Sequence, residues 1–184
     1  MKNLNVLTNE QASPEVQAIF AAITKKYGKV PNLYAVTANS PVALKAVLDY
    51  GDTLGTGEFT AKEQESVALV VAQVNGCQYC LAAHTAVGKM LGFSKEETLS
   101  IRSGNSDDPK LGALVALAGE IVLSKGWPAQ KLVDDFFAAG FSKAALVELI
   151  GLVSLNVFKN YLNHVADAPL DFDEVQQLKQ EAVV

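Results

Sequence analysis

Helix start and stop signals follow one another along nearly the whole chain of 184 residues. Residues 13–28, "SPEVQAIFAAITKKYG", begin with Ser-Pro, carry apolar residues at helical spacing and end in glycine, as a capped helix does. Residues 60–74 begin with Thr60, and Glu63 follows three residues later as in a capping box. No part of the sequence reads as two alternating strands joined by a tight turn. We therefore predict an all-α fold.

Two segments need a separate interpretation. Residues 65–74, "ESVALVVAQV", contain a β-branched run that could form a buried strand, but the length of the segment and the preceding cap favour a helix. The end of the chain, residues 168–184, "APLDFDEVQQLKQEAVV", is expected to be a tail with a short acidic helix.

The composition excludes some functions. Fifteen Lys and Arg against twenty Asp and Glu give a net charge of −5, and Arg102 is the only arginine, so nucleic acid is not an expected partner. The longest apolar stretches are each broken by a glutamate and are shorter than the ~20 residues of a membrane span, and the start lacks a secretion signal. We expect a soluble cytoplasmic protein. Because 49% of the residues are hydrophobic, we also expect a homo-oligomer that buries part of this surface.

Two segments of the chain are weakly similar to each other in sequence. Residues 59–84 and 141–164 each begin with Phe and a hydroxyl cap, run through a long apolar helix, meet an Asn and end in His. Only the first copy has cysteines. We predict one helical domain over 1–184, with a catalytic core at about 41–104 and a second pseudo-repeat at about 107–166.

The only two cysteines, Cys77 and Cys80, lie three residues apart, and His84 follows four residues later. On a helix, the two cysteines are about 60° apart around the axis, with the histidine between them. Cys77 directly follows Gly76 at the expected start of a helix, where free backbone N–H groups stabilise a thiolate. This arrangement is typical of a dithiol that opens and closes.

Glu65 adds a fourth group, twelve residues before Cys77 in an apolar helix. A carboxylate on an apolar face is costly unless it is paired or used. A turn at Asn75-Gly76 would fold the two helices together, so that Glu65 reaches His84 or a sulfur. A base, a histidine and two thiols in one pocket form a proton relay for thiol chemistry.

Each residue also has a simpler interpretation. The two cysteines could be small buried residues, His84 a satisfied core or surface histidine, and Glu65 an exposed residue. Two cysteines, a histidine and a glutamate could bind zinc, but structural zinc sites usually draw ligand pairs from loops. A thioredoxin fold needs strands that this sequence lacks. We expect no metal and no other cofactor.

The combination of Glu65, Cys77, Cys80 and His84 at these spacings resembles the core signature of the alkylhydroperoxidase D family, within the carboxymuconolactone decarboxylase-like superfamily. The flanks "GKVPNLYAVTANSPVALKAV" and "GFSKEET" look like those of its peroxidase-related members, so the resemblance covers roughly residues 28–104. It implies an all-helical bundle of hairpins with internal pseudosymmetry. It also implies assembly into trimers, hexamers or other homo-oligomers, including dimers.

The resemblance further implies roles for these residues. Cys80 would attack hydrogen peroxide or an organic hydroperoxide and become a sulfenic acid, and Cys77 would condense with it to a disulfide. A dithiol donor, such as a lipoylated or thioredoxin-like protein, would then reduce the pair. Glu65 and His84 would relay the proton that activates Cys80. The expected function is antioxidant defence by a thiol peroxidase or disulfide reductase.

The sequence departs from the family pattern at one place. The founding peroxidases have a second histidine immediately before the second cysteine, where this chain has Tyr79. A phenol can pass a hydrogen bond but is a poor base near neutral pH. His164 could compensate if the two halves pack together, although a structural role in the second repeat is the simpler interpretation.

Two other functions remain open. A cofactor-free decarboxylase of the carboxymuconolactone type could use the same fold, but that chemistry needs no cysteine pair. A non-enzymatic redox-sensing oligomer would use the pair without turnover.

Overall fold

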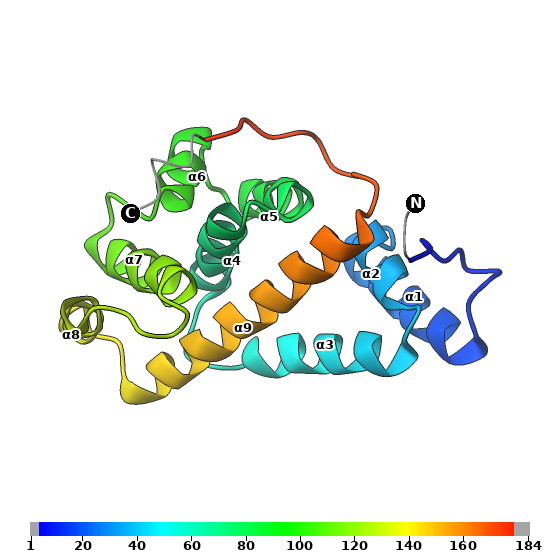
Figure 1. Ribbon diagram of the computed structural model, residues 1–184, viewed down its shortest axis with the longest axis horizontal. Helices are drawn as coiled ribbons and strands as arrows, with labels where there is room; N and C mark the ends of the chain where they lie inside the picture. The colour runs from blue at the N-terminus through cyan, green and yellow to red at the C-terminus, as the bar shows by residue number, and fades with distance from the viewer. Residues whose placement is uncertain (1–3, 179–184) are drawn as a thin grey trace.

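The computed structural model describes residues 4–178, and within this range it contains nine helices and no β-strand (Figure 1). The helices are α1 (Pro14–Tyr27), α2 (Asn32–Thr37), α3 (Pro41–Leu54), α4 (Ala61–Asn75), α5 (Gln78–Met90), α6 (Lys95–Arg102), α7 (Pro109–Leu123), α8 (Gln130–Ala138) and α9 (Lys143–Ala166). The predicted all-α class is confirmed.

Hydroxyl side chains cap the helices where the sequence indicates. At the start of α1, Ser13 accepts a hydrogen bond from the backbone N–H of Val16, and Pro14 occupies the first helical position. At the start of α4, the Thr60 hydroxyl accepts from the N–H of Glu63 at 3.2 Å, and the Glu63 carboxylate accepts from the N–H of Thr60 at 2.8 Å. These bonds satisfy N–H groups that no helix carbonyl can reach, so they fix where the helices begin.

α4 is the central helix of the bundle, and α5, α7 and α9 pack around it (Figure 1). Every residue from Val67 to Ala72 is at most 3% exposed. A helix that is apolar on all sides has to be surrounded by other elements. This position explains the β-branched run in residues 65–74, which forms a helix as expected and not a strand.

α9 is the longest helix, with 24 residues, and it packs against α3, α4 and α7. Among the described residues it is the one helix long and apolar enough to cross a membrane. Of its most apolar stretch of 18 residues, 44% is buried inside the protein. Its contacts with several other helices, α2 and α5 included, account for its apolar character, because each contact needs an apolar face.

The two similar segments, 59–84 and 141–164, follow different paths. The first bends after Asn75, where Gly76 adopts a φ of 68° and allows a second helix to begin. The second continues as one helix, α9. The two meet directly, since the Asn75 amide donates to Asn160 Oδ1 at 2.8 Å. A duplication of one helical unit remains a prediction.

The chain beyond α9 runs across α5 towards α6, as the last coloured stretch in Figure 1 shows. We call residues 167–178 the C-terminal segment. Asp167 ends α9 with a φ of 50°, and Pro169 follows two residues later. The prediction of a short acidic helix in 168–184 is wrong for the part that the structure describes, and residues 179–184 lie outside the described range.

Side chains from other elements hold the C-terminal segment in place. The Tyr79 hydroxyl donates to Asp171 Oδ1 at 2.7 Å, and the guanidinium of Arg102 donates to the Gln176 carbonyl at 2.8 Å. The ammonium of Lys29 pairs with the Asp171 carboxylate at 2.9 Å. A short isolated helix is marginal in water, so these external bonds outweigh the local helical tendency.

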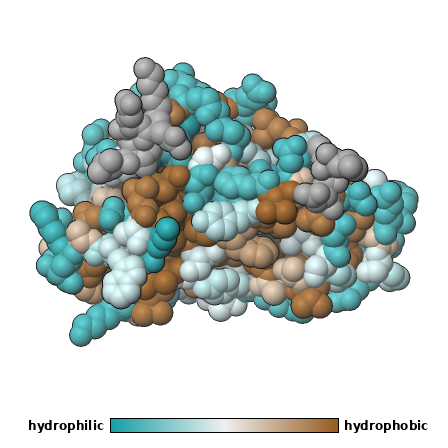
Figure 2. All heavy atoms as spheres, in the orientation of Figure 1, coloured by the Kyte–Doolittle hydropathy of each residue, from teal (hydrophilic) through white to brown (hydrophobic). Residues whose placement is uncertain are grey.

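Several large apolar side chains reach the surface, and Figure 2 shows apolar patches among polar residues on one face of the protein. Five of them are spaced along α9 so that they share one side of this helix. They are Val147, Ile150, Phe158, Tyr161 and Val165, between 44% and 70% exposed.

Candidate active site

The two cysteines lie at the turn from α4 to α5. Gly76, in the left-handed conformation, ends α4, and Cys77 is the N-cap of α5. The Cys77 sulfur accepts a hydrogen bond from the backbone N–H of Cys80 at 3.3 Å. The sulfur of Cys77 therefore occupies the helix N-terminus, where backbone dipoles stabilise negative charge.

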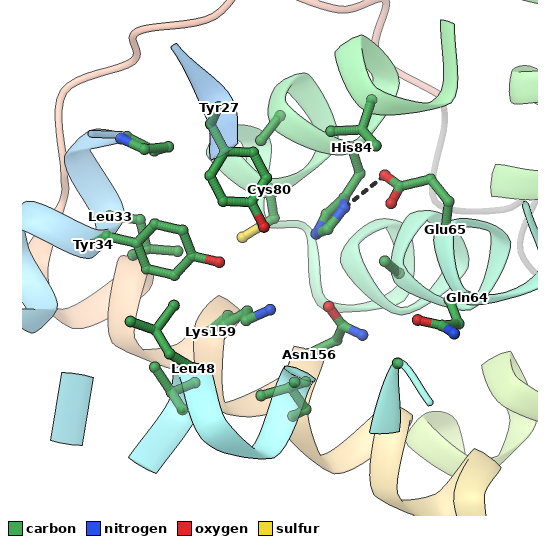
Figure 3. Close-up of a pocket in the computed structure, with 18 of the residues that line it drawn as sticks. Tyr27, Leu33, Tyr34, Leu48, Gln64, Glu65, Cys80, His84, Asn156 and Lys159 are labelled. Carbon is green, nitrogen blue, oxygen red and sulfur yellow. Dashed lines mark hydrogen bonds and ion pairs between the residues drawn. The ribbon is translucent and has the colours of Figure 1, made fainter. Parts of the chain in front are cut away.

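Cys77 and Cys80 are joined by a disulfide, with 5.3 Å between their Cα atoms. Cys77 is 0% exposed and Cys80 is 2% exposed. Only Cys80 of the two lines the large cavity beside α5, and its sulfur points towards that cavity (Figure 3). A small molecule in the cavity therefore meets Cys80 first.

Glu65 of α4 and His84 of α5 form a direct pair, in which the carboxylate Oε1 lies 2.7 Å from the ring Nδ1. The Glu65 side chain is 12% exposed and that of His84 is 20% exposed. The carboxylate fixes the orientation of the imidazole, and the other ring nitrogen faces the cavity (Figure 3). His84 also lies one helical turn after Cys80, so a base and a sulfur face the same space.

The cavity has a volume of about 600 Å³ and draws its walls from helices far apart in the sequence. α1 to α5, α9 and the C-terminal segment all contribute. Most of its walls are apolar, and the apolar lining includes Leu33, Val47, Leu48, Ala68, Ala83, Val87, Met90, Leu152, Leu155 and Phe172. The space is much larger than hydrogen peroxide needs and is typical of a site for an organic ligand.

The cavity wall also holds polar side chains that are not among the candidates found from the sequence. Four of these are Tyr27, Tyr34, Asn156 and Lys159. Figure 3 shows the hydroxyl of Tyr34 and the ammonium of Lys159 directed into the space. Burial raises the pKa of Tyr34 and lowers the pKa of Lys159. Asn156 and Lys159 lie three residues apart on one side of a mostly apolar helix, but α9 carries other polar residues, so this spacing alone does not mark them.

Tyr79 does not occupy the position of a base. Its hydroxyl accepts from the backbone N–H of Leu33 at 3.1 Å and donates to Asp171 at 2.7 Å. Burial, together with the hydrogen bond to this carboxylate, raises the pKa of Tyr79 well above its ordinary value. Its ring packs edge-on against Phe172, with 5.7 Å between centroids. Tyr79 therefore ties α5 to α2 and to the C-terminal segment.

His164 lies apart from the other candidate residues. It is exposed near the end of α9, where its ring is 6.2 Å from that of Tyr161, and it does not line the cavity. The structure therefore brings Glu65, Cys80 and His84 together, with Cys77 behind, and leaves His164 outside. Within residues 4–178, no three His, Cys, Asp or Glu side chains are grouped to hold a metal ion.

Comparison with known proteins gives a family match over part of the chain and a shared fold over most of it. Residues 41–118 match the carboxymuconolactone decarboxylase family. A peroxidase-related protein from Ralstonia eutropha JMP134, described as an alkylhydroperoxidase AhpD core, is 17% identical with a TM-score of 0.82, over 91% of this chain and 90% of that one. A peroxidase-related protein from Silicibacter sp. TM1040 is 21% identical with a TM-score of 0.78, over 91% and 92%.

A third similar structure has a different described activity. It is the debrominase Bmp8, solved in complex with 2,3,4-tribromopyrrole, which is 15% identical with a TM-score of 0.80 over 93% of this chain and 92% of that one. At these identities, the three structures show a shared fold. The search of curated proteins found no significant match.

Proposed function

We propose that the chain is a thiol-dependent peroxidase of the alkylhydroperoxidase D-like type, whose dithiol is Cys77 and Cys80. The match of residues 41–118 to the carboxymuconolactone decarboxylase family and the fold shared with two peroxidase-related proteins support this proposal. The observation that carries the proposal is the position of Cys80. It faces the cavity, is bonded to Cys77 behind it, and shares the space with the paired His84 and Glu65.

The first step is reduction of the peroxide by the free dithiol form. His84, held by Glu65, takes the proton of the Cys80 thiol, and the thiolate attacks the terminal oxygen of the hydroperoxide. The O–O bond breaks, the sulfur becomes a sulfenic acid, and the alkoxide leaves as an alcohol after it receives the proton from His84. The sulfur loses two electrons and the peroxide gains them.

The second step returns the pair to the observed disulfide. The Cys77 thiol attacks the Cys80 sulfenic acid, an S–S bond forms, and hydroxide leaves as water with the thiol proton. The position of Cys77 at the helix N-terminus favours its thiolate. A dithiol donor, a lipoylated or thioredoxin-like protein, then reduces the disulfide and becomes a disulfide itself. This cycle requires a reducing compartment, so we place the protein in the cytoplasm.

We also propose that the protein works as a homo-oligomer. The apolar row on α9, from Val147 to Val165, supports this proposal because it faces away from the cavity and is exposed in a single chain. A trimer or a hexamer would cover this row and leave the cavity walls unchanged.

The proposed function is tested by peroxide consumption with dithiothreitol as the reductant. Wild type should consume cumene hydroperoxide at steady state, whereas Cys80→Ser and Cys77→Ser should lose turnover. Oxidation of the reduced protein should lower its mass by two hydrogens, and dithiothreitol should restore it. A wild-type rate no higher than that of the Cys80→Ser variant would contradict the proposal. A cofactor-free decarboxylase would not need the cysteines, so both variants would keep its decarboxylase activity. A pure redox sensor would show the mass change without turnover of peroxide.

A further inference from the structure

We propose that Lys159, Asn156 and Tyr34 form an anion-binding end of the cavity, so that the substrate is an organic hydroperoxide with an apolar body and a carboxylate group. The assignment of a hydroperoxide rests on the function proposed above. The anion site rests on separate observations, and it makes these three residues determinants of substrate specificity.

The first observation is the free charge of Lys159. Its ammonium points into the cavity (Figure 3), and it takes part in none of the ion pairs formed by residues 4–178. Burial of a cation without a partner is unfavourable, and it lowers the pKa of this lysine. A ligand carboxylate would supply the missing counter-charge.

The second observation is that the other charges near the cavity are already paired. Glu65 binds His84 at 2.7 Å. At the rim, Lys26 binds Asp52 at 2.9 Å. The remaining cation in the cavity wall, Lys29, binds Asp171 at 2.9 Å. Lys159 therefore carries the one charge in the cavity wall, among the described residues, that forms no direct ion pair. The carboxylates of Glu65 and Asp52 act on it only at longer range, and both are already paired with other side chains.

The third observation is the presence of hydrogen-bonding groups beside Lys159. Asn156 lies three residues before it on α9, is 4% exposed, and uses one amide hydrogen to bind the Leu152 carbonyl at 2.9 Å. The hydroxyl of Tyr34 enters the same space from α2 (Figure 3), and its raised pKa keeps it protonated as a donor. An ammonium, an amide and a phenol are suitable donors for a carboxylate.

The fourth observation concerns the rest of the ligand. Apart from its polar side chains, the cavity wall is mostly aliphatic, and a space of about 600 Å³ can hold a molecule with a ring or a short chain. Hydrogen peroxide would leave most of this space empty and would use none of the three donors. An amphipathic hydroperoxide would place its carboxylate on α9 and its peroxide group at Cys80.

A binding experiment tests the anion site without any chemistry. The probes are 4-isopropylbenzoate and its neutral isostere 4-isopropylbenzamide, titrated by calorimetry into the disulfide form of wild type and Lys159→Met. Lys143→Met, an exposed change on the same helix, is the matched control. Wild type and the control should bind the carboxylate about tenfold or more tightly than the amide, since a bond to a charged group contributes this much. Lys159→Met should bind both alike. Equal affinities in wild type, or no binding of the carboxylate, would overturn the proposal.

Kinetics then separate the two proposals. Cumene hydroperoxide and its para-carboxylate are compared as substrates of reduced wild type and Lys159→Met, with thermal unfolding to confirm that the variant is folded. The variant should lose about tenfold in kcat/KM for the carboxylated substrate and less than about twofold for the neutral one. If both substrates are consumed with kcat/KM values that Lys159→Met does not alter, the anion site is wrong and the peroxidase stands. If neither is consumed while Lys159-dependent binding persists, the peroxidase is wrong and the anion site stands.

Discussion

Glu65 Oε1 and His84 Nδ1 lie 2.7 Å apart and join α4 to α5 across the turn that carries Cys77. The carboxylate comes from the buried central helix, so this pair is part of the core as well as of the cavity. A carboxylate that binds one ring nitrogen leaves the other free to exchange a proton with a group in the cavity. The pair is therefore suited to proton transfer in the cavity as well as to packing in the core.

The variant Glu65→Gln should fold and assemble as wild type but lose peroxide reduction by about 10²-fold, because the amide keeps the volume and cannot stabilise an imidazolium. Stopped-flow measurement of Cys80 oxidation gives the rate, and circular dichroism checks the fold. Glu96→Gln, an exposed change on α6, is the control and should keep the wild-type rate. Equal rates for Glu65→Gln and wild type would assign this residue a purely structural role.

The two cysteines should differ in their reaction with peroxide. In Cys77→Ser, Cys80 should form a sulfenic acid that a dimedone probe captures, because its sulfur faces the cavity. In Cys80→Ser, Cys77 is fully buried and does not line the cavity, so it should give little or no adduct. Mass spectrometry of the labelled peptides measures both. An adduct that forms only when Cys77 remains would invert the assigned roles.

Tyr79→Phe should lower stability more than activity. The change removes a hydroxyl that bonds to Leu33 and Asp171, so we expect a loss of about 1–2 kcal/mol in the free energy of unfolding. The C-terminal segment should also exchange its amide hydrogens faster. Tyr50→Phe, an exposed change on α3, should affect neither quantity. A loss of peroxide reduction as large as that of a His84→Gln variant would show that Tyr79 acts in the proton relay.

The helices and the centre of the site could be predicted from the sequence because both depend on residues that are close together along the chain. Caps and glycine stops are decided by bonds within one turn, and Glu65, Cys80 and His84 come from two helices joined by a short turn. The rest of the cavity depends on helices that meet only after folding. On α9, Lys159 and Asn156 are about 60° apart around the axis, whereas His164 is about 140° from Lys159. Which side of α9 faces inward is set by its packing on α3 and α4 and not by the spacing of its polar residues.

The helix predicted for the C-terminal segment is wrong because the conformation of this segment depends on residues far away in the sequence. Its acidic side chains and polar composition resemble those of an exposed helix, but its position depends on partners such as Tyr79 and Arg102, which precede it by many residues. Side-chain bonds of this kind leave no periodic pattern in the sequence.

The apolar row on α9 predicts how the assembly can be broken. A charge at Ile150 or Phe158 would have to be buried in any contact that covers this row, at a cost that opposes association. Light scattering should give a multiple of 19.6 kDa for wild type and a smaller multiple for Ile150→Glu or Phe158→Glu. Trp127→Glu, a change at a still more exposed apolar site off this helix, should leave the mass unchanged. A wild-type mass of one chain at micromolar concentration would sink the oligomer proposal.

The charge of Lys159 lowers the free energy of unfolding, because its position in the cavity removes the ammonium from water. Burial lowers the pKa of its ammonium, so the folded chain binds this proton less tightly than the unfolded chain does, for which the ordinary value is 10.5. Below the folded pKa, the desolvated charge opposes folding in full. As the pH rises from the folded value towards 10.5, the unfolded chain binds more protons than the folded one, so stability increases with pH.

Lys159→Met should therefore stabilise the ligand-free protein, because Met fills similar space without a charge. At neutral pH we expect a Tm higher by about 2–4 °C, the shift that roughly 1 kcal/mol produces in a domain of this size. The advantage should shrink as the pH approaches 10.5, where the wild-type lysine becomes neutral in both states. Calorimetry across this pH range, with Lys143→Met as the exposed control, measures the difference. A variant that is less stable than wild type at neutral pH would mean that the ammonium has a partner in the folded protein, and the anion site would then lose its free charge.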